Sequence, residues 1–140
     1  MKDIKIVDVP EKMQKYYGAG KMVHPDVEMV EEVIREIPKG KVATIDLIAK
    51  RIANGVGVDV ACPMRTGNAI KQIAESFLDQ NTDNQLPFWR VIRTDKQVVR
   101  SKNYELAAAK LEEEGFELEF KKDDQIKVHF TKQSLHKFQD

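Results

Sequence analysis

The sequence predicts an α+β domain that is mainly α: a winged helix, the variant of the helix-turn-helix motif that ends in a β-hairpin. Apolar residues recur at helical spacing in three successive segments between residues 26 and 78. A fourth helical segment follows at 104–114, and apolar and polar residues then alternate on both sides of residues 121–125. Three helices followed by a loop, a helix and a terminal hairpin are typical of winged-helix proteins.

The first residues are expected to form an N-terminal arm. Residues 4–9 alternate as in a strand, and a helical stretch over residues 11–17 ends where Gly18 and Gly20 interrupt the pattern. Pro25 then stands where a first helical residue is favoured, with acidic residues after it at the positive end of a helix. We therefore expect an arm over residues 1–24 and one domain over residues 25–140.

Three amphipathic helices are expected to form the centre of the domain. The first covers residues 26–37. Thr44 caps the second, which the turn sequence at residues 54–57 breaks. Thr66 caps the third, over residues 66–78, which places Leu78 on its inner face. The outer face of this third helix carries Arg65, Asn68, Lys71, Gln72 and Glu75.

The second half of the chain begins with a polar loop at residues 79–85. The motif Pro-Phe-Trp-Arg follows at 87–90, and Val91–Ile92 continues as a short extended segment. The fourth helix ends at Gly115, a favourable position for a left-handed cap. The hairpin turns near Asp-Asp at 123–124, and a short helix over residues 132–138 closes the chain.

Composition excludes several classes of protein. The 140 residues carry 23 Lys and Arg and 23 Asp and Glu, so nucleic-acid contact would depend on a local patch. No apolar run approaches the roughly 20 residues that span a bilayer, and residues 1–7 lack the apolar core of a signal peptide. The single cysteine, Cys62, permits no intrachain disulfide, and His24, His129 and His136 are too dispersed for a metal site, which suggests surface or capping roles. We expect a cytoplasmic protein with no metal, no cofactor and no membrane contact.

Four short blocks occur in order along the chain. They are Ile-Pro-Lys-Gly-Lys-Val-Ala-Thr at 37–44, Gly-Asn-Ala at 67–69, Pro-Phe-Trp-Arg at 87–90 and Leu-Glu-Glu-Glu-Gly at 111–115. Together they resemble the O6-alkylguanine-DNA alkyltransferases over residues 30–118. The resemblance implies that residues 37–44 lead into the first helix of a DNA-binding motif and that residues 67–69 start its recognition helix. The family places that helix in the minor groove of double-stranded DNA.

The resemblance also implies an active-site loop without its chemistry. In the family a cysteine thiolate follows the motif proline, and a histidine backed by a glutamate helps to deprotonate it. Here Phe88 and Trp89 stand at those positions, and only Glu114 matches. Phenylalanine has no nucleophile, and indole offers an N–H donor but no accessible base. We expect a former alkyl pocket at Pro87, Phe88, Trp89 and Glu114, no catalytic residue, and a small hydrophobic role for Cys62.

The DNA contacts of the family carry over unevenly. The family has a tyrosine after the threonine, where it displaces a phosphate, but Ile45 follows Thr44 here. The family also inserts an arginine three residues before the helix glycine, to fill the gap that the flipped base leaves. That position is Met64, with Arg65 one residue later. Either the loop is shifted and Arg65 serves, or Met64 is an apolar wedge, or base flipping has been lost.

Other candidate residues have two interpretations each. Asn68, Lys71 and Gln72 either contact phosphates or bases, or form a solvated helix face. Arg90 either contacts DNA or secures the loop through hydrogen bonds within the fold.

The aromatic pair also has two interpretations. Phe88 and Trp89 either stack on a base or pack in the core, although two adjacent rings on a loop do not easily both face inward.

Two functions are consistent with the sequence. The leading hypothesis is a non-enzymatic DNA-binding protein of the alkyltransferase-like type, which binds alkylated guanine without repairing it and flags the lesion for another pathway. A repair or regulatory protein would then be a partner. The alternative is a protein-interaction or regulatory module that keeps the fold and has lost DNA binding. The zero net charge and the missing tyrosine and arginine motivate this alternative.

Overall fold

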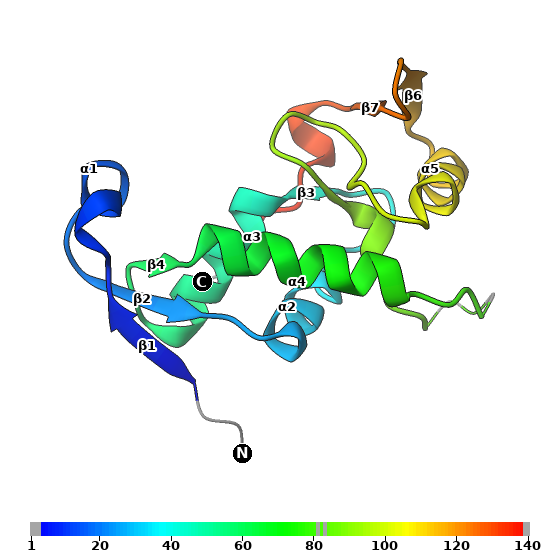
Figure 1. Ribbon diagram of the computed structural model, residues 1–140. Helices are drawn as coiled ribbons and strands as arrows, with labels where there is room; N and C mark the ends of the chain where they lie inside the picture. Colours follow the sequence, from blue (N-terminus) through cyan, green and yellow to red (C-terminus); the bar gives the residue numbers. More distant parts are fainter. Residues whose placement is uncertain (1–3, 81, 83, 139–140) are drawn as a thin grey trace.

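Helices α2 (Val27–Ile34), α3 (Ile45–Val56) and α4 (Pro63–Ser76) pack against one another at the centre of the molecule (Figure 1). Their apolar faces share one core with α5 (Tyr104–Glu113), in which Leu111 is fully buried. The protein is therefore a mixed α/β fold in which helices form the core and short strands join them. The computed structural model describes residues 4–80, 82 and 84–138.

The first two of these helices begin where the sequence predicts. The carboxylate of Asp26 caps α2, because it accepts a hydrogen bond from the backbone N–H of Met29 at 2.9 Å. Helix α2 ends at Ile34 rather than at 37. Helix α3 begins after Thr44, although the Thr44 side chain makes no capping hydrogen bond.

Helix α3 ends inside the expected segment 54–57, but near its end, because the helix continues through Asn54 and Gly55 to Val56. A glycine inside a helix costs only about 1 kcal/mol relative to alanine, which tertiary packing overrides. Gly57 has φ +88° and ends the helix in the left-handed conformation that favours glycine.

Helix α4 starts at Pro63, earlier than the start at Thr66 that the sequence predicts. Cys62 occupies the N-cap position and Pro63 the first helical position, where the missing N–H of proline is no loss. Thr66 is not the cap: its side chain is fully buried in the helix, and its hydroxyl donates to the Cys62 carbonyl at 2.8 Å. Residues 67–69 are consequently inside the helix. Because α4 ends at Ser76, Leu78 is 76% exposed and is not part of the inner face.

The N-terminal arm is joined to the rest of the protein through a sheet. Strands β1 (Lys5–Asp8) and β2 (Lys21–His24) are antiparallel, and β2 also pairs in parallel with β4 (Val60–Ala61). The segment between β1 and β2 contains a 3-10 turn and the short helix α1, whose bounds are Glu11–Met13 and Gln14–Tyr17. The sequence did not predict β2 or β4. Figure 1 shows the arm beyond the N-terminal end of α4.

Two further pairs of strands complete the fold. Strand β3 (Ala43–Thr44) pairs in parallel with β5 (Val91–Ile92), which confirms the extended segment after the aromatic motif. Strands β6 (Glu117–Phe120) and β7 (Ile126–His129) form the predicted hairpin. Its turn contains Asp123 and Asp124, both with φ near +60°.

The closing helix expected over residues 132–138 is absent, and only a 3-10 turn, η3 (Lys132–Ser134), forms. The chain extends after this turn because the Val42 N–H donates to the Ser134 carbonyl and the His136 N–H donates to the Val42 carbonyl. The expected loop at 79–85 includes residues 81 and 83, which lie outside the described residues. In the described part of the chain, no helix has the length and apolar character needed to cross a membrane.

Candidate nucleic-acid interface

The aromatic motif forms one 3-10 turn, η2 (Phe88–Arg90), whose two rings point into the protein. Phe88 and Trp89 are 5% and 6% exposed, and their ring centroids lie 5.8 Å apart at 82°. Phe77, just after α4, packs on Phe88 at 4.6 Å and meets Trp89 edge-on at 6.1 Å. The expectation that both rings do not face inward is therefore wrong. Successive side chains of a 3-10 turn diverge by about 120°, and Phe77 packs against both rings.

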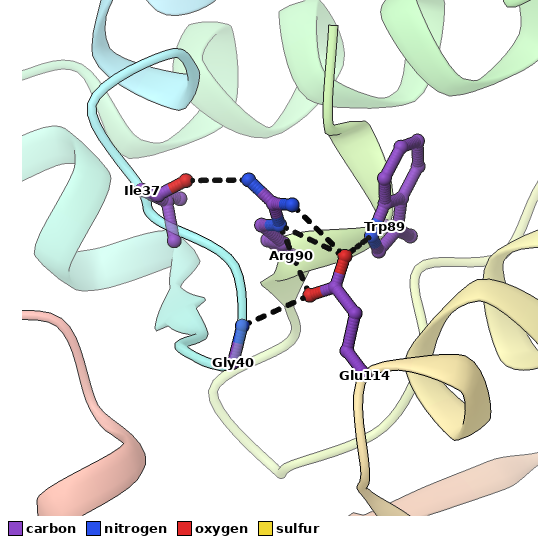
Figure 2. Close-up of polar contacts among 5 residues, drawn as sticks. All are labelled: Ile37, Gly40, Trp89, Arg90 and Glu114. Carbon is purple, nitrogen blue, oxygen red and sulfur yellow. Dashed lines mark hydrogen bonds and ion pairs between the residues drawn. The ribbon is translucent and has the colours of Figure 1, made fainter. Parts of the chain in front are cut away.

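A hydrogen-bond network around the Glu114 carboxylate fixes this turn in place (Figure 2). Trp89 Nε1 donates to Glu114 Oε2 at 2.8 Å, and Arg90 donates through Nη2 at 2.9 Å and Nε at 3.1 Å. The Gly40 N–H donates to Oε1 at 3.2 Å, and Arg90 Nη1 donates to the Ile37 carbonyl at 2.8 Å. The network joins η2, the end of α5 and the turn before β3.

The network also determines the ionisation of Glu114. Burial raises the pKa of its carboxyl, but the hydrogen bonds from Arg90, Trp89 and Gly40 and the charge of Arg90 outweigh burial, so the pKa lies below its ordinary value. The side chains of Glu114 and Arg90 are 6% and 15% exposed. Both oxygens of this buried carboxylate accept hydrogen bonds, so Glu114 has a structural role. Arg90 secures the loop through hydrogen bonds within the fold, which is one of the two interpretations of this residue.

An open cavity of about 440 Å³ lies beside the network. Trp89 and Glu114 line it, together with Lys110, whose Nζ lies 5.7 Å from the centre of the Trp89 ring system. Pro87 and Phe88 do not line this cavity and are buried. The four residues of the predicted former alkyl pocket are thus close together, but only two of them border open space.

The outward face of α4 carries the other predicted contacts. Met64 is 74% exposed and stands with Arg65 in the first turn of the helix. Glu75 is half-buried and accepts a hydrogen bond from the Lys102 backbone N–H at 3.2 Å. The predicted contacts that are exposed on this helix are Met64, Arg65, Asn68, Lys71 and Gln72.

Ile45 lies close to the start of α4, and Thr44, in the strand directly before Ile45, pairs with Ile92. Ile45 is half-buried and lines a cavity of about 470 Å³ together with Pro63 of α4 and Tyr17 of the arm. The carboxylates of Asp46 and Asp59 also line this cavity. Lys50 lines the cavity as well, so this side of α4 is mainly apolar and has two acidic residues and one basic residue.

The opposite side of α4 contains residues that the sequence interpretation missed. Lys5 and His24 of the arm line a groove together with Arg65. Nδ1 of His24 is buried and has no hydrogen-bond partner among the described residues, although the residue as a whole is half-buried and lines the groove. The pairing of β2 with β4 brings these residues together, and no local pattern in the sequence reports that pairing.

The fold is similar to known structures. Two solved structures are similar to the chain: Schizosaccharomyces pombe Atl1 in complex with damaged DNA containing O6-carboxymethylguanine, and S. pombe ATL in complex with DNA. Each has 25% sequence identity and a TM-score of 0.54, over 79% of this chain and 94% of the other. No curated protein sequence matches the chain at a significant level.

A family model for the DNA-binding domain of 6-O-methylguanine DNA methyltransferase matches residues 27–116. This region begins at the first residue of α2 and ends just before β6, so it contains the helical core and the Pro-Phe-Trp-Arg motif. The arm and the β6–β7 hairpin lie outside it. Because the match covers more than half of the sequence, the chain belongs to the 6-O-methylguanine DNA methyltransferase family through its DNA-binding domain.

Proposed function

We propose that this chain is a non-enzymatic DNA-binding protein of the alkyltransferase-like type, which recognises alkylated guanine in double-stranded DNA and marks it for another repair protein. One observation carries the proposal: a chain of this DNA-binding family holds a buried phenylalanine, Phe88, at the position of the reactive residue. The similarity to Atl1, whose structure contains damaged DNA, supports the same conclusion.

The absence of alkyl transfer follows from the chemistry of the loop. Phe88 has no nucleophilic atom, and the only polar atom of the Trp89 ring, Nε1, donates a hydrogen bond to Glu114. The Glu114 carboxylate accepts from Arg90, Trp89 and Gly40. A loop with these contacts holds the fold together and has no group that can attack an alkyl carbon.

We assign α3 and α4 to the helix-turn-helix of a winged helix, with the β6–β7 hairpin as its wing and α4 in the minor groove. Residues 25–140 form the domain in this proposal, and residues 1–24 form an arm that is docked on it. In this proposal the exposed face of α4 supplies polar contacts to the DNA through Arg65, Asn68, Lys71 and Gln72. Thr44 and Ile45 lie beside the sugar-phosphate backbone of the DNA.

Met64 is the proposed wedge at the lesion. An apolar side chain that is 74% exposed in the first turn of a helix suits insertion between bases, as other minor-groove proteins do with Met, Leu or Phe. Arg65, one residue later, then contacts the backbone. Met64 as a wedge is thus preferred to a shifted loop in which Arg65 fills the gap and to a loss of base flipping.

Fluorescence anisotropy with two matched duplexes, one with O6-methylguanine and one with guanine, tests the proposal across a salt series. We expect both duplexes to bind at low salt and the modified duplex to bind more tightly. Equal affinities for the two duplexes would contradict lesion recognition but would still support DNA binding. A lack of binding to either duplex at low salt would favour the protein-interaction module. Intact-mass measurement after incubation should show no alkyl adduct on the protein, Cys62 included.

A further inference from the structure

The N-terminal arm and α4 form the two walls of a groove of about 440 Å³. Lys5 of β1 and His24 of β2 lie on one wall, and they are paired with each other in the strand register. Arg65, Asn68 and Gln72 of α4 form the other wall, and residues at the start of α2 also line the groove. The groove is continuous with the face of α4 that carries the proposed DNA contacts.

Positive charge gathers in this groove although the chain as a whole has zero net charge. Burial, Arg65 and then Lys5 lower the pKa of His24, so both cationic side chains act on the same imidazole. Asp26 is the one acidic residue among the described residues that line the groove, and its carboxylate accepts the backbone N–H of Met29. The groove therefore favours an anion between the arm and α4.

The sheet fixes the position of Lys5 relative to α4. Strand β2 pairs with β4, which lies directly before the first turn of α4, so the arm and Arg65 are parts of one connected unit. Gly20 allows this close docking, because a Cβ at that position would lie 2.4 Å from Asp59 Oδ2. Asp59 in turn accepts the Lys21 N–H at 2.9 Å.

We propose that the arm is part of the DNA interface and that Lys5 and Arg65 together hold a phosphate of the duplex in this groove. Asn68 and Gln72, on the same wall as Arg65, offer further hydrogen-bond donors to the backbone. The inference rests on the proposed DNA-binding function and extends it to a segment outside the family region of residues 27–116. The cavity on the other side of α4 suits a phosphate less well, because it is lined by two carboxylates, Asp46 and Asp59, and one lysine, Lys50.

Lys5→Ala is the first variant that tests this proposal, with Lys12→Ala as the matched control. Both lysines are exposed residues of the arm, and Lys12 does not line the groove. Anisotropy of a labelled duplex across a salt series should show several-fold weaker binding for Lys5→Ala. Its plot of log affinity against log salt should be shallower by about one unit, the value for one lost phosphate contact.

Lys12→Ala should match the wild type, and Arg65→Ala should show the same change in slope as Lys5→Ala. The loss for Lys5→Ala should be equal on duplexes with and without O6-methylguanine, because a phosphate contact carries no base information. An unchanged slope for Lys5→Ala, with Arg65→Ala weakened, would overturn the role of the arm and leave the proposed function intact. No binding by the wild type would overturn both. Equal melting temperatures for all variants would show that folding is not the cause.

Discussion

Two regions of the protein differ sharply in how they use polar and apolar side chains. Around η2, both aromatic rings are buried and both oxygens of the Glu114 carboxylate accept hydrogen bonds. At the start of α4, Met64 is 74% exposed and Arg65 is exposed beside it. The loop that resembles an active site is the structural region, and the helix face is the one with side chains available for a ligand.

The contrast has a physical basis in the cost of leaving polar groups unpaired. A buried carboxylate and guanidinium need every partner they have, so the network tolerates few substitutions. An exposed methionine on a helix contributes little to folding, so it is retained or replaced according to what it binds. Mutations in the two regions should therefore separate stability from binding.

The largest expected effect is that of Glu114→Ala on stability. It leaves the 15%-exposed Arg90 guanidinium without its carboxylate and also removes the acceptor of Trp89 and Gly40. We expect the free energy of unfolding to fall by about 3 kcal/mol, as for other broken buried ion pairs. Urea denaturation measures this. Glu36→Ala, which breaks the more exposed pair with Arg51, is the control and should cost less than about 1 kcal/mol. Similar losses for the two variants would contradict the comparison.

Trp89→Phe should have a smaller effect on the same network. The variant keeps an aromatic ring in the core but removes the donor that lies 2.8 Å from Glu114 Oε2. Losing a hydrogen bond to a charged group, together with some ring volume, should cost about 2 kcal/mol in thermal or urea unfolding. Phe88→Leu changes ring packing without touching the carboxylate. It should therefore leave the acid sensitivity that Glu114 gives the protein unchanged.

Met64→Ala should show the opposite division between stability and binding. Its melting temperature should match that of the wild type, because the side chain is mostly exposed. Affinity for the O6-methylguanine duplex should fall by roughly five- to tenfold, a typical loss for an apolar anchor. Leu78→Ala is the matched control, since Leu78 is 76% exposed but lies after the end of α4. Equal affinities of the Met64→Ala variant and the wild type would contradict the role of Met64 as a wedge.

The smallest expected effect is a pH dependence of stability from Glu114. Its pKa in the folded protein is lower than the ordinary value of 4.5, so its contribution is fully present above that value. The contribution is lost as the pH falls below 4.5 and through the lower folded pKa. Unfolding free energies measured from pH 6 downward should therefore fall less steeply for Glu114→Gln than for the wild type. Parallel curves would mean that Glu114 is not held ionised.

Local patterns were enough to predict several elements of the fold. Helical periodicity predicted α2, α3 and α5, and alternation with a polar turn predicted the hairpin, whose Asp123 and Asp124 have the positive φ of a tight turn. These elements depend on neighbours in the sequence. The start of α4 was missed because two local rules competed there, and Pro63 at the first helical position won over Thr66 as a cap.

The order of short motifs also predicted the family, and all four blocks lie within residues 27–116, which the family model matches. Helical spacing predicted which residues share the outer face of α4, and the family resemblance made them candidates for DNA contact. Asn68, Lys71 and Gln72 are exposed as that spacing indicates.

Tertiary structure decided the features that depend on distant residues. Trp89 and Glu114 are 25 positions apart in sequence, and their hydrogen bond exists only because η2 packs against α5. The parallel pairing of β2 with β4 likewise brings Lys5 and His24 to Arg65. Periodicity reports which face of an element is buried, but it does not report which other element covers that face. The chain sequence alone therefore predicted the four main helices and the hairpin, while tertiary packing buried the two rings of η2 and joined the arm to α4.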